Sequence, residues 1–524
     1  MSRYVAIALV LLAASIGLAP PATAQPAPTV ASTQTFPATN APPPAVDIDT
    51  GRVTGAWEGP DIVAFKGIPF AAPPVGPLRW RPPQPAAPWS GARDATAYGP
   101  ACPQAVDPAG RPNGGGYAGV TSEDCLNLNV FAPAHAKKAP VMVWIFGGGN
   151  VSGANSIAPN DGTSFARDGV VLVSINYRLG ALGFFAHPAL TKAAPAGEPL
   201  GAYGIMDQIA ALKWVQRNIA RFGGDPHNVT VFGESAGGID VLTLMATPAA
   251  RGLFQKATVQ SGGGWGEPVT LAKAEADGAA LAKSLGLPDD ATVAQLRALP
   301  LDGLVGAHGR TTGIVVDGRL LPESVTEAFA RGHQAAVPLI IGSNSWEASL
   351  LLPPQYQSYV DAAPASLKAV YAAEAPDTAK LAQAMFTDGT MGAPARWIAA
   401  RQSAKAPTWL YHFSYVRVVR RGKIPGANHT SENPYVFDTQ MVVPNYAEQI
   451  QPEDIGHAKL MHSCWVAFAK TGSPVCSAGP AWPAYRPTSD QLLEFGPTAD
   501  VRTHFRQPEL DAQDQANAAL LSGR

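Results

Sequence analysis

The residues with the clearest chemical signature in this sequence surround Ser235. The segment Phe232 to Gly238 reads Phe-Gly-Glu-Ser-Ala-Gly-Gly and contains the pattern G-x-S-x-G. It follows the β-branched run Val229 to Phe232 and precedes an apolar segment, beginning near Ile239, that is typical of a helix. A serine on a tight strand-to-helix turn presents its hydroxyl at the end of the strand, where it can act as a nucleophile. Because the pattern also arises by chance, its context decides its meaning.

Three consecutive glycines, Gly147 to Gly149, provide that context at the end of the buried run Val141 to Phe146. A backbone without Cβ atoms can turn its N–H groups towards a ligand, and such groups stabilise the negative charge of a tetrahedral intermediate. Strand, glycines and a later serine elbow occur in the order that serine hydrolase chemistry requires. The predicted oxyanion hole therefore consists of the N–H groups of Gly148, Gly149 and Ala236. The alternative is a plain glycine turn.

The elements that must position these residues follow from the apolar pattern. Short runs rich in β-branched residues are predicted as strands covered on both faces. Apolar residues spaced three and four apart from Ile205 to Ile219 predict a helix that packs on a sheet. Strands alternating with helices predict a mostly parallel sheet, preceded by a small antiparallel lead-in sheet within Val46 to Phe131. The predicted strands are Val141 to Phe146, Val170 to Ile175, Val229 to Phe232 and Val337 to Ile341.

The N-terminal segment is typical of an exported protein. Arg3 precedes the apolar run Val5 to Leu18, and Ala22-Thr23-Ala24 forms a small-residue cleavage site. We expect residues 1–24 to be a signal peptide and residues 25–45, rich in Ala and Pro, to be a flexible leader. Residues 46–524 are expected to form a single catalytic domain, without a membrane span after cleavage and located in the periplasm or outside the cell. An uncleaved membrane anchor is the alternative.

Net charge and cysteine content bear on the binding partners and the disulfides of the chain. The chain of 524 residues has a formal net charge of -2, so nothing favours nucleic acid or an anionic membrane as a partner. Its four cysteines fall into two close pairs, Cys102 with Cys125 and Cys464 with Cys476. In an exported chain this spacing predicts two local disulfides, with free buried thiols as the alternative.

Further motifs run along the chain in order: Phe65 to Ala71, Pro73 to Gly76, Arg79-Trp80, Ser122 to Asn129, Asn176 to Arg178 and Gly204 to Asp225. Together with the serine elbow they resemble the type-B carboxylesterase/lipase family, which includes cholinesterases and bacterial para-nitrobenzyl-esterase-like enzymes. The resemblance covers nearly the whole mature chain. It implies the α/β-hydrolase fold, with a large, mostly parallel central sheet flanked by helices, and hydrolysis of a carboxylic ester through an acyl-enzyme.

The resemblance also implies the partners of Ser235. Glu347 follows the predicted strand Val337 to Ile341 and matches the family's acid, while His429 matches its general base. The chain order serine, acid, histidine is the order that this fold requires. Arg79 and Glu123 resemble the family's internal ion pair beside the first disulfide.

Departures from the family pattern fall in the predicted substrate pocket. Asn150 stands where an aromatic residue is common, and Trp346 where Asp is usual. With Trp265 and Glu234 they form the expected pocket residues, and ordinary packing is the alternative for Asn150, Trp265 and Trp346.

Other functions and ligands are less well supported. Amide, thioester or lactone hydrolysis needs the same three residues and differs only in the pocket, whereas neuroligin-like binding proteins lose them. The segment Gly114 to Gly119 fits G-x-G-x-x-G without a preceding strand, and His457 and His462 are spaced too far apart for a helical metal pair. We therefore predict a small-molecule ester substrate, no cofactor and no metal. The sequence does not determine the oligomeric state.

A basic cluster consisting of Arg417, Arg420, Arg421 and Lys423 precedes His429. Such clusters are usually solvated surface. The alternative is that the cluster lies at the rim of the site and favours esters that carry a free carboxylate.

Overall fold

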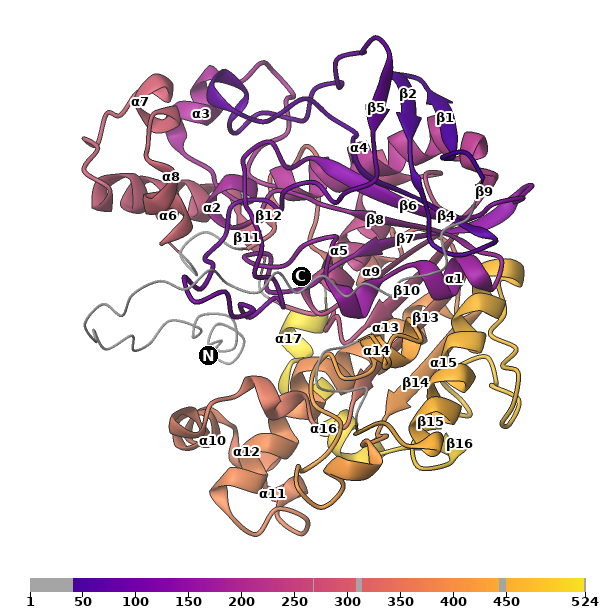
Figure 1. The fold of residues 1–524 in the computed structure, drawn as a ribbon. Coiled ribbons are helices and arrows are strands. Elements are labelled where there is room, and N and C mark those ends of the chain that lie inside the picture. The colour runs from indigo at the N-terminus through magenta and orange to yellow at the C-terminus, as the bar shows by residue number, and fades with distance from the viewer. Residues whose placement is uncertain (1–40, 267, 308–312, 443–448, 523–524) are drawn as a thin grey trace.

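The computed structural model describes residues 41–266, 268–307, 313–442 and 449–522. Its centre is an eleven-stranded sheet in the order β16-β15-β14-β13-β10-β9-β7-β8-β6-β4-β3 (Figure 1). All strands from β15 to β8 in this order run parallel, and antiparallel strands flank them at both ends. The predicted signal peptide, residues 1–24, lies outside the described residues, as does the leader up to residue 40.

The strands of this sheet have the following bounds: β3 (Ala56–Trp57), β4 (Ile62–Pro69), β6 (Asn127–Pro133), β7 (Ala139–Ile145), β8 (Val171–Ile175), β9 (Gly224–Glu234), β10 (Lys256–Gln260), β13 (Leu339–Asn344), β14 (Thr408–Phe413), β15 (Gln491–Phe495) and β16 (Ala499–Thr503). The four strands predicted from the sequence correspond to β7, β8, β9 and β13. Nearly all residues of β7, β8 and β13 are buried, as expected for parallel strands covered by helices on both faces.

A small lead-in sheet contains β1 (Ala45–Ile48), β2 (Gly51–Thr54) and β5 (Ala92–Asp94). Strands β1 and β2 pair antiparallel as predicted, and β5 joins β2 in parallel. The short strands β11 (Val269–Thr270) and β12 (Val315–Val316) form a separate parallel pair.

The helix predicted within Ile205 to Ile219 is α4, and its buried stripe packs on β9 and on helix α5. No helix in the described parts of the chain is long and apolar enough to cross a membrane. The α-helices are α1 (Thr163–Arg167), α2 (Gly180–Gly183), α3 (Pro188–Ala193), α4 (Tyr203–Asn218), α5 (Ala236–Ala246), α6 (Leu271–Ser284), α7 (Val293–Arg297), α8 (Leu301–Val305), α9 (Val325–Arg331), α10 (Tyr356–Ala362), α11 (Ala365–Tyr371), α12 (Thr378–Thr387), α13 (Ala393–Gln402), α14 (Asn433–Val436), α15 (Pro452–Thr471), α16 (Gln507–Ala516) and α17 (Ala518–Leu521).

The main core fills the space between sheet and helices. An aromatic cluster joins strands β7 and β9 to helix α1 and to the end of α14: the ring of Phe232 lies 4.7 Å from Trp144, 5.9 Å from Phe165 and 5.6 Å from Phe437. Helices α10, α11 and α12 form a group of their own, visible at the lower left of Figure 1. This group has a separate apolar core, which includes Ala348.

Both predicted disulfides are present, Cys102–Cys125 and Cys464–Cys476. Glu123 lies two residues before Cys125 in the first bridge and contacts Arg79 at 2.5 Å, in the ion pair that the family resemblance implies.

Candidate active site

Ser235 lies at the turn between strand β9 and helix α5. Its backbone has φ 56° and ψ -126°, a strained conformation for a residue with a side chain. The turn is sharp because the chain packs tightly against the end of β7: a Cβ atom on Gly237 would lie only 2.1 Å from the carbonyl oxygen of Ile145. The Ser235 N–H donates to the carbonyl oxygen of Gln260, which fixes the turn against strand β10. Ser235, which is half-buried, thus lies at the carboxyl end of strand β9.

The glycine loop that follows β7 lies directly against this turn. A Cβ atom on Gly147 would approach Ser235 Cβ to 2.9 Å. No hydrogen-bond acceptor for the N–H groups of Gly148, Gly149 and Ala236 is present among the described residues. The N–H group of Ala236 belongs to the first turn of α5, where backbone donors have no partner within the helix. Two sets of unpaired donors therefore flank Ser235.

Glu347 and His429 form a buried pair. His429 Nδ1 lies 2.6 Å from Glu347 Oε2. The other carboxylate oxygen, Glu347 Oε1, accepts hydrogen bonds from the Ser261 hydroxyl at 2.6 Å and from the Asn344 N–H at 2.7 Å. Glu347 is fully buried and His429 is 6 % exposed. The carboxylate is therefore held in one orientation, and it fixes the imidazole through Nδ1.

The loops that carry these two residues are joined by hydrogen bonds. The Trp346 N–H donates to the carbonyl oxygen of Ala427, and the Ala427 N–H donates to the Ser345 hydroxyl oxygen. The His429 N–H donates to the Ser349 hydroxyl oxygen at 2.9 Å. Because β13 and β14 are adjacent parallel strands, their following loops meet at one sheet edge, and these bonds align the loops in register.

Two further carboxylates surround His429. Glu234 Oε1 lies 3.2 Å from His429 Nε2, and both Glu234 and Glu432 are buried. Burial raises the pKa of Glu234 to about 8 and also raises the pKa of Glu432. Burial lowers the pKa of His429, but the negative charges of Glu234 and Glu347 outweigh it and raise the pKa of the imidazole to about 9. The site therefore favours a positive charge on His429.

His429 Nε2 makes no hydrogen bond to any described residue, Ser235 included. It lies beside the side chain of Glu234, the residue that immediately precedes the serine. Hydrogen bonds between nucleophile and base are often long without substrate and shorten in the reactive complex. The nitrogen that must accept a proton thus makes no hydrogen bond to a described residue, and its neighbour in the structure is the carboxylate of Glu234.

The other predicted pocket residues lie in different surroundings. Asn150 is buried, with its amide bound to Asp240 and Tyr177 rather than open to solvent. Trp265 is half-buried, and its ring lies 6.3 Å from that of Trp397 in an edge-to-face arrangement. Trp346 is half-buried beside the core of helices α10 to α12. The prediction that these side chains contact substrate remains a prediction.

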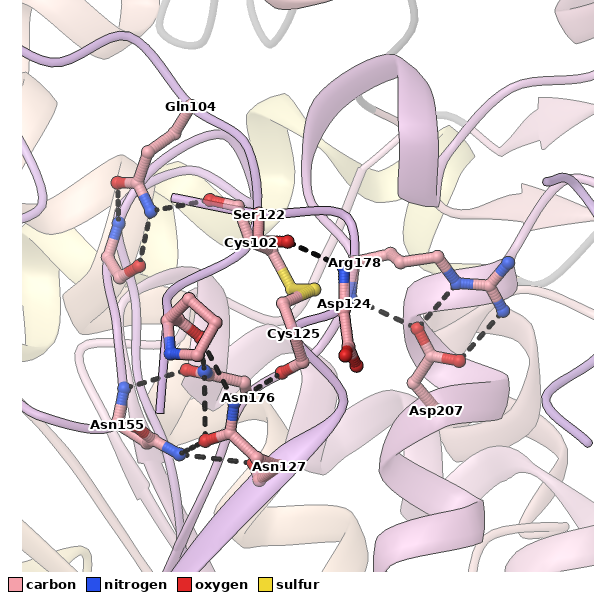
Figure 2. Close-up of a disulfide and its surroundings, with 12 residues drawn as sticks. Cys102, Gln104, Ser122, Asp124, Cys125, Asn127, Asn155, Asn176, Arg178 and Asp207 are labelled. Atoms are coloured by element: carbon pink, nitrogen blue, oxygen red, sulfur yellow. Dashed lines mark hydrogen bonds and ion pairs between the residues drawn. A yellow bond between two sulfur atoms is a disulfide. The ribbon is translucent and has the colours of Figure 1, made fainter. Parts of the chain in front are cut away.

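The loop closed by the first disulfide holds the far end of the glycine loop, and Figure 2 shows its surroundings. Gln104 Nε2 donates to the Gly153 carbonyl oxygen at 2.7 Å, and the Gly153 N–H donates to Gln104 Oε1 at 2.8 Å. Asn155, two residues further, is bound to Asn127 and Asn176 (Figure 2). The disulfide loop therefore supports the backbone that carries the unpaired donors.

Sequence reasoning missed several residues of this site. Ser261 follows strand β10 and Asn344 is the last residue of β13, and their position at the end of a buried strand was their only signal. Glu432 lies three residues after His429, but nothing in its spacing reveals burial. Gln104 and Asp240 have no sequence signal, since their contacts join segments far apart in the chain.

The carboxylesterase family model matches residues 42–371 and 361–513. The chain belongs to the carboxylesterase family. Among curated relatives, fumonisin B1 esterase of Sphingopyxis macrogoltabida is 35% identical over 469 residues, covering 84% of this chain and 85% of the relative. Para-nitrobenzyl esterase of Bacillus subtilis is 37% identical over 472 residues, covering 84% and 93%. A solved structure of a thermophilic PNB esterase superposes with a TM-score of 0.80 at 34% identity, covering 90% of this chain and 99% of the other.

Membership of this family, with the observed sheet, confirms the α/β-hydrolase fold and makes the chain a carboxylic ester hydrolase. The resemblance stated from sequence motifs is therefore confirmed.

Proposed function

We propose that this carboxylesterase hydrolyses its ester through an acyl-enzyme on Ser235. In this proposal His429 is the general base, Glu347 orients it, and the N–H groups of Gly148, Gly149 and Ala236 form the oxyanion hole. The observation that supports it most is the 2.6 Å contact between His429 Nδ1 and buried Glu347 beside a strained serine turn.

The first half of the reaction acylates the serine. Ser235 Oγ attacks the ester carbonyl carbon while its proton passes to His429 Nε2, and the carbonyl electron pair moves onto oxygen. Each N–H donor that binds this oxyanion stabilises the transition state by about 3 kcal/mol. When the intermediate collapses, the ester C–O bond breaks, and the leaving alcohol takes the proton from His429.

The second half releases the acid. A water molecule attacks the acyl carbon and gives a proton to His429 Nε2. The bond between the acyl carbon and Ser235 Oγ then breaks, and the serine recovers its proton from the imidazole. Glu347 remains ionised throughout and stabilises the imidazolium that forms in each half.

The proposal predicts that Ser235→Ala lowers kcat for a 4-nitrophenyl ester by at least about four orders of magnitude. The melting temperature should stay close to that of the wild type, because the hydroxyl makes no hydrogen bond to any residue that the structure describes. Mass spectrometry after treatment with a fluorophosphonate should locate the label on Ser235 in the wild type and find none in the variant. A folded alanine variant that turns over normally would refute the assignment.

A small-molecule ester is the substrate class that we propose, since the relatives are named as esterases. Parallel assays of 4-nitrophenyl esters of increasing chain length and of the matching anilides distinguish esterase from amidase activity. We expect the esters to be cleaved much faster than the anilides, because a nitroaniline is a poorer leaving group than a nitrophenolate.

We further propose that residues 46–524 act as one catalytic unit, exported to the periplasm or secreted. The family match across residues 42–513 and the two disulfides support this proposal. N-terminal sequencing of enzyme recovered outside the cytoplasm should read from Gln25. Intact Met1 in that material would contradict cleavage after residue 24.

A further inference from the structure

A buried polar network lies behind the glycine loop and is separate from the Ser235, His429 and Glu347 constellation. Asn150 Nδ2 donates to Asp240 Oδ1 at 3.1 Å, and Gln208 Nε2 donates to Asp240 Oδ2 at 2.6 Å. The Tyr177 hydroxyl lies 3.1 Å from Asn150 Oδ1 and 2.7 Å from the carbonyl oxygen of Phe146. Asp240, Gln208 and Tyr177 are fully buried, and Asn150 is 4 % exposed.

The network connects the two elements that carry the unpaired N–H groups. Asn150 follows Gly149 directly, whereas Asp240 lies on α5, the helix that begins with Ala236. Tyr177 contacts the residues on either side of the three glycines, because Phe146 precedes them and Asn150 follows them.

The glycine loop needs such support because its backbone is irregular. Gly148 and Gly149 have φ angles of 92° and 66°, and Asn150 has φ 59°. Asn150 therefore occupies the left-handed region, which Asn tolerates better than most residues with a side chain. Its carbonyl oxygen accepts from the Gly180 N–H at 2.7 Å, so both its backbone and its side chain are fixed.

Asp240 has no cationic partner among the described residues. It is bound only by the amides of Asn150 and Gln208, and burial raises its pKa to about 7. Burying a carboxyl group without a cationic partner costs stability, because water solvates the group better, and here only the two hydrogen bonds offset that cost. Those bonds connect helix α5 to the glycine loop and to helix α4.

We propose that Asp240 and Asn150 are positioning residues of the oxyanion hole: their side-chain hydrogen bond fixes the glycine loop against helix α5, so that the N–H groups of both elements converge on one oxygen atom. The inference rests on the proposed function of Ser235 and deepens it. Neither residue touches the reacting atoms. Both act through the backbone donors, whose effect is larger in the transition state than in the bound ester.

The test compares Asn150→Gly and Asp240→Ala with the wild type, using 4-nitrophenyl acetate as substrate. Glycine accepts φ 59° without strain, so Asn150→Gly removes only the side chain. Because misplacing catalytic groups by about 1 Å reduces rates by about a hundredfold, we expect kcat to fall at least about tenfold in each variant. We expect KM to change less than about twofold. The double variant should lose no more than the more affected single variant, because both substitutions break one connection.

A second readout separates positioning from general destabilisation. An aryl trifluoromethyl ketone forms a tetrahedral adduct with the serine, and its inhibition constant should rise in proportion to the loss of kcat/KM. Thr243→Val is the matched control, because Thr243 is buried on the same helix and its hydroxyl bonds only to the Ile239 carbonyl oxygen in the described structure. This control should lose stability without losing kcat.

The conservative variant Asp240→Asn provides rescue. Its side-chain oxygen can still accept from Asn150, and Gln208 Oε1, which has no partner among the described residues, can accept from the new amide after rotation. We expect its kcat to lie within about threefold of the wild type, in contrast to Asp240→Ala.

Wild-type kcat in folded Asn150→Gly and Asp240→Ala would overturn the inference, as would additive losses or an equal loss in Thr243→Val. If Asp240→Ala does not fold, Asn150→Gly decides alone. An active Ser235→Ala would instead refute the proposed function. An inactive Ser235→Ala beside fully active positioning variants would refute only this inference.

Discussion

His429 lies among three buried carboxylates, of which only Glu347 binds it through a hydrogen bond. A negative charge near an imidazole stabilises the protonated form, whereas the general base must be neutral to accept the serine proton. The site thus makes the base stronger and at the same time shifts its working range towards higher pH. An unperturbed imidazole has a pKa of about 6.5.

We predict that kcat/KM for a neutral ester rises with pH through a midpoint above 6.5, since the pKa of His429 is raised to about 9. Glu234→Gln removes the carboxylate nearest Nε2 and should lower that midpoint by roughly one pH unit. This shift is measured from the pH dependence of kcat/KM, under conditions where the chemical step limits the rate. Glu453→Gln is the control, since Glu453 is exposed and paired with Arg421. Identical midpoints in the wild type and Glu234→Gln would contradict the electrostatic account.

Single residues differ in how well the sequence predicts them. The elbow around Ser235 carries its own pattern, and Glu347 and His429 follow from family motifs. Asn150 shows the limit: it was recognised as a departure from the family and expected near the substrate, yet its side chain points into a buried network with Asp240. That contact joins two segments ninety positions apart, which no local pattern encodes.

At the scale of elements, the loop between Cys102 and Cys125 acts as a support for the glycine loop. Its Gln104 makes two hydrogen bonds to Gly153. The second disulfide instead joins helix α15 to the segment that follows it. The two bridges should therefore differ in their effect on catalysis although both constrain the unfolded chain.

We predict that replacing either cysteine pair by serine lowers the free energy of unfolding by roughly 3 kcal/mol, since loops of 23 and 12 residues differ in closure entropy by only about 0.6 kcal/mol. Only Cys102→Ser with Cys125→Ser should also lower kcat at a temperature where the variant remains folded. Denaturant unfolding and steady-state kinetics on both double variants measure this difference. Equal kcat in the two variants would show that the loop stabilises the fold without supporting the site.

The order of strands is the part of the fold that sequence patterns predicted least. Buried runs identified β7, β8, β9 and β13, because apolar composition is local. That β10 lies between β9 and β13 depends on pairing across the sheet, and this arrangement is what brings Ser261 to Glu347. The parallel addition of β5 to the lead-in sheet is likewise a long-range pairing.

On the scale of the whole molecule, the basic cluster before His429 contains one arginine in an ion pair with a carboxylate and two exposed side chains. Arg421 pairs with Glu453, and its guanidinium lies 5.2 Å from the ring of Tyr415. Arg420 and Lys423 are exposed. A nearly neutral molecule attracts an anionic ester only through such local charge, so these two side chains are the ones to test.

We predict that these two side chains attract anionic esters to the site. The double variant Arg420→Gln/Lys423→Gln should then lower kcat/KM for an ester bearing a free carboxylate several-fold at low salt, with little change for a neutral ester. Added salt should shrink the difference, because charges are screened over about 10 Å at 0.1 M. The double variant Lys137→Gln/Lys138→Gln is the charge-matched control. These exposed residues precede β7 and so lie at the amino end of a parallel strand, whereas Ser235 follows the carboxyl end of β9. Equal effects on both esters would assign the pair to the solvated surface.

Glu347 begins the 3-10 helix Glu347–Leu350, and the next residue, Ala348, belongs to the apolar core of helices α10 to α12. The Ala348 N–H also donates to the Thr387 hydroxyl oxygen, at the end of α12. We expect opening of that small core to displace the backbone of Glu347 and so disturb its carboxylate, even while the central sheet that carries Ser261 and Asn344 stays intact. Mild heating should therefore abolish turnover before the protein melts, and hydrogen exchange should show amides of α10 to α12 losing protection together with activity. Intact protection of these helices in inactivated enzyme would argue against this order of events.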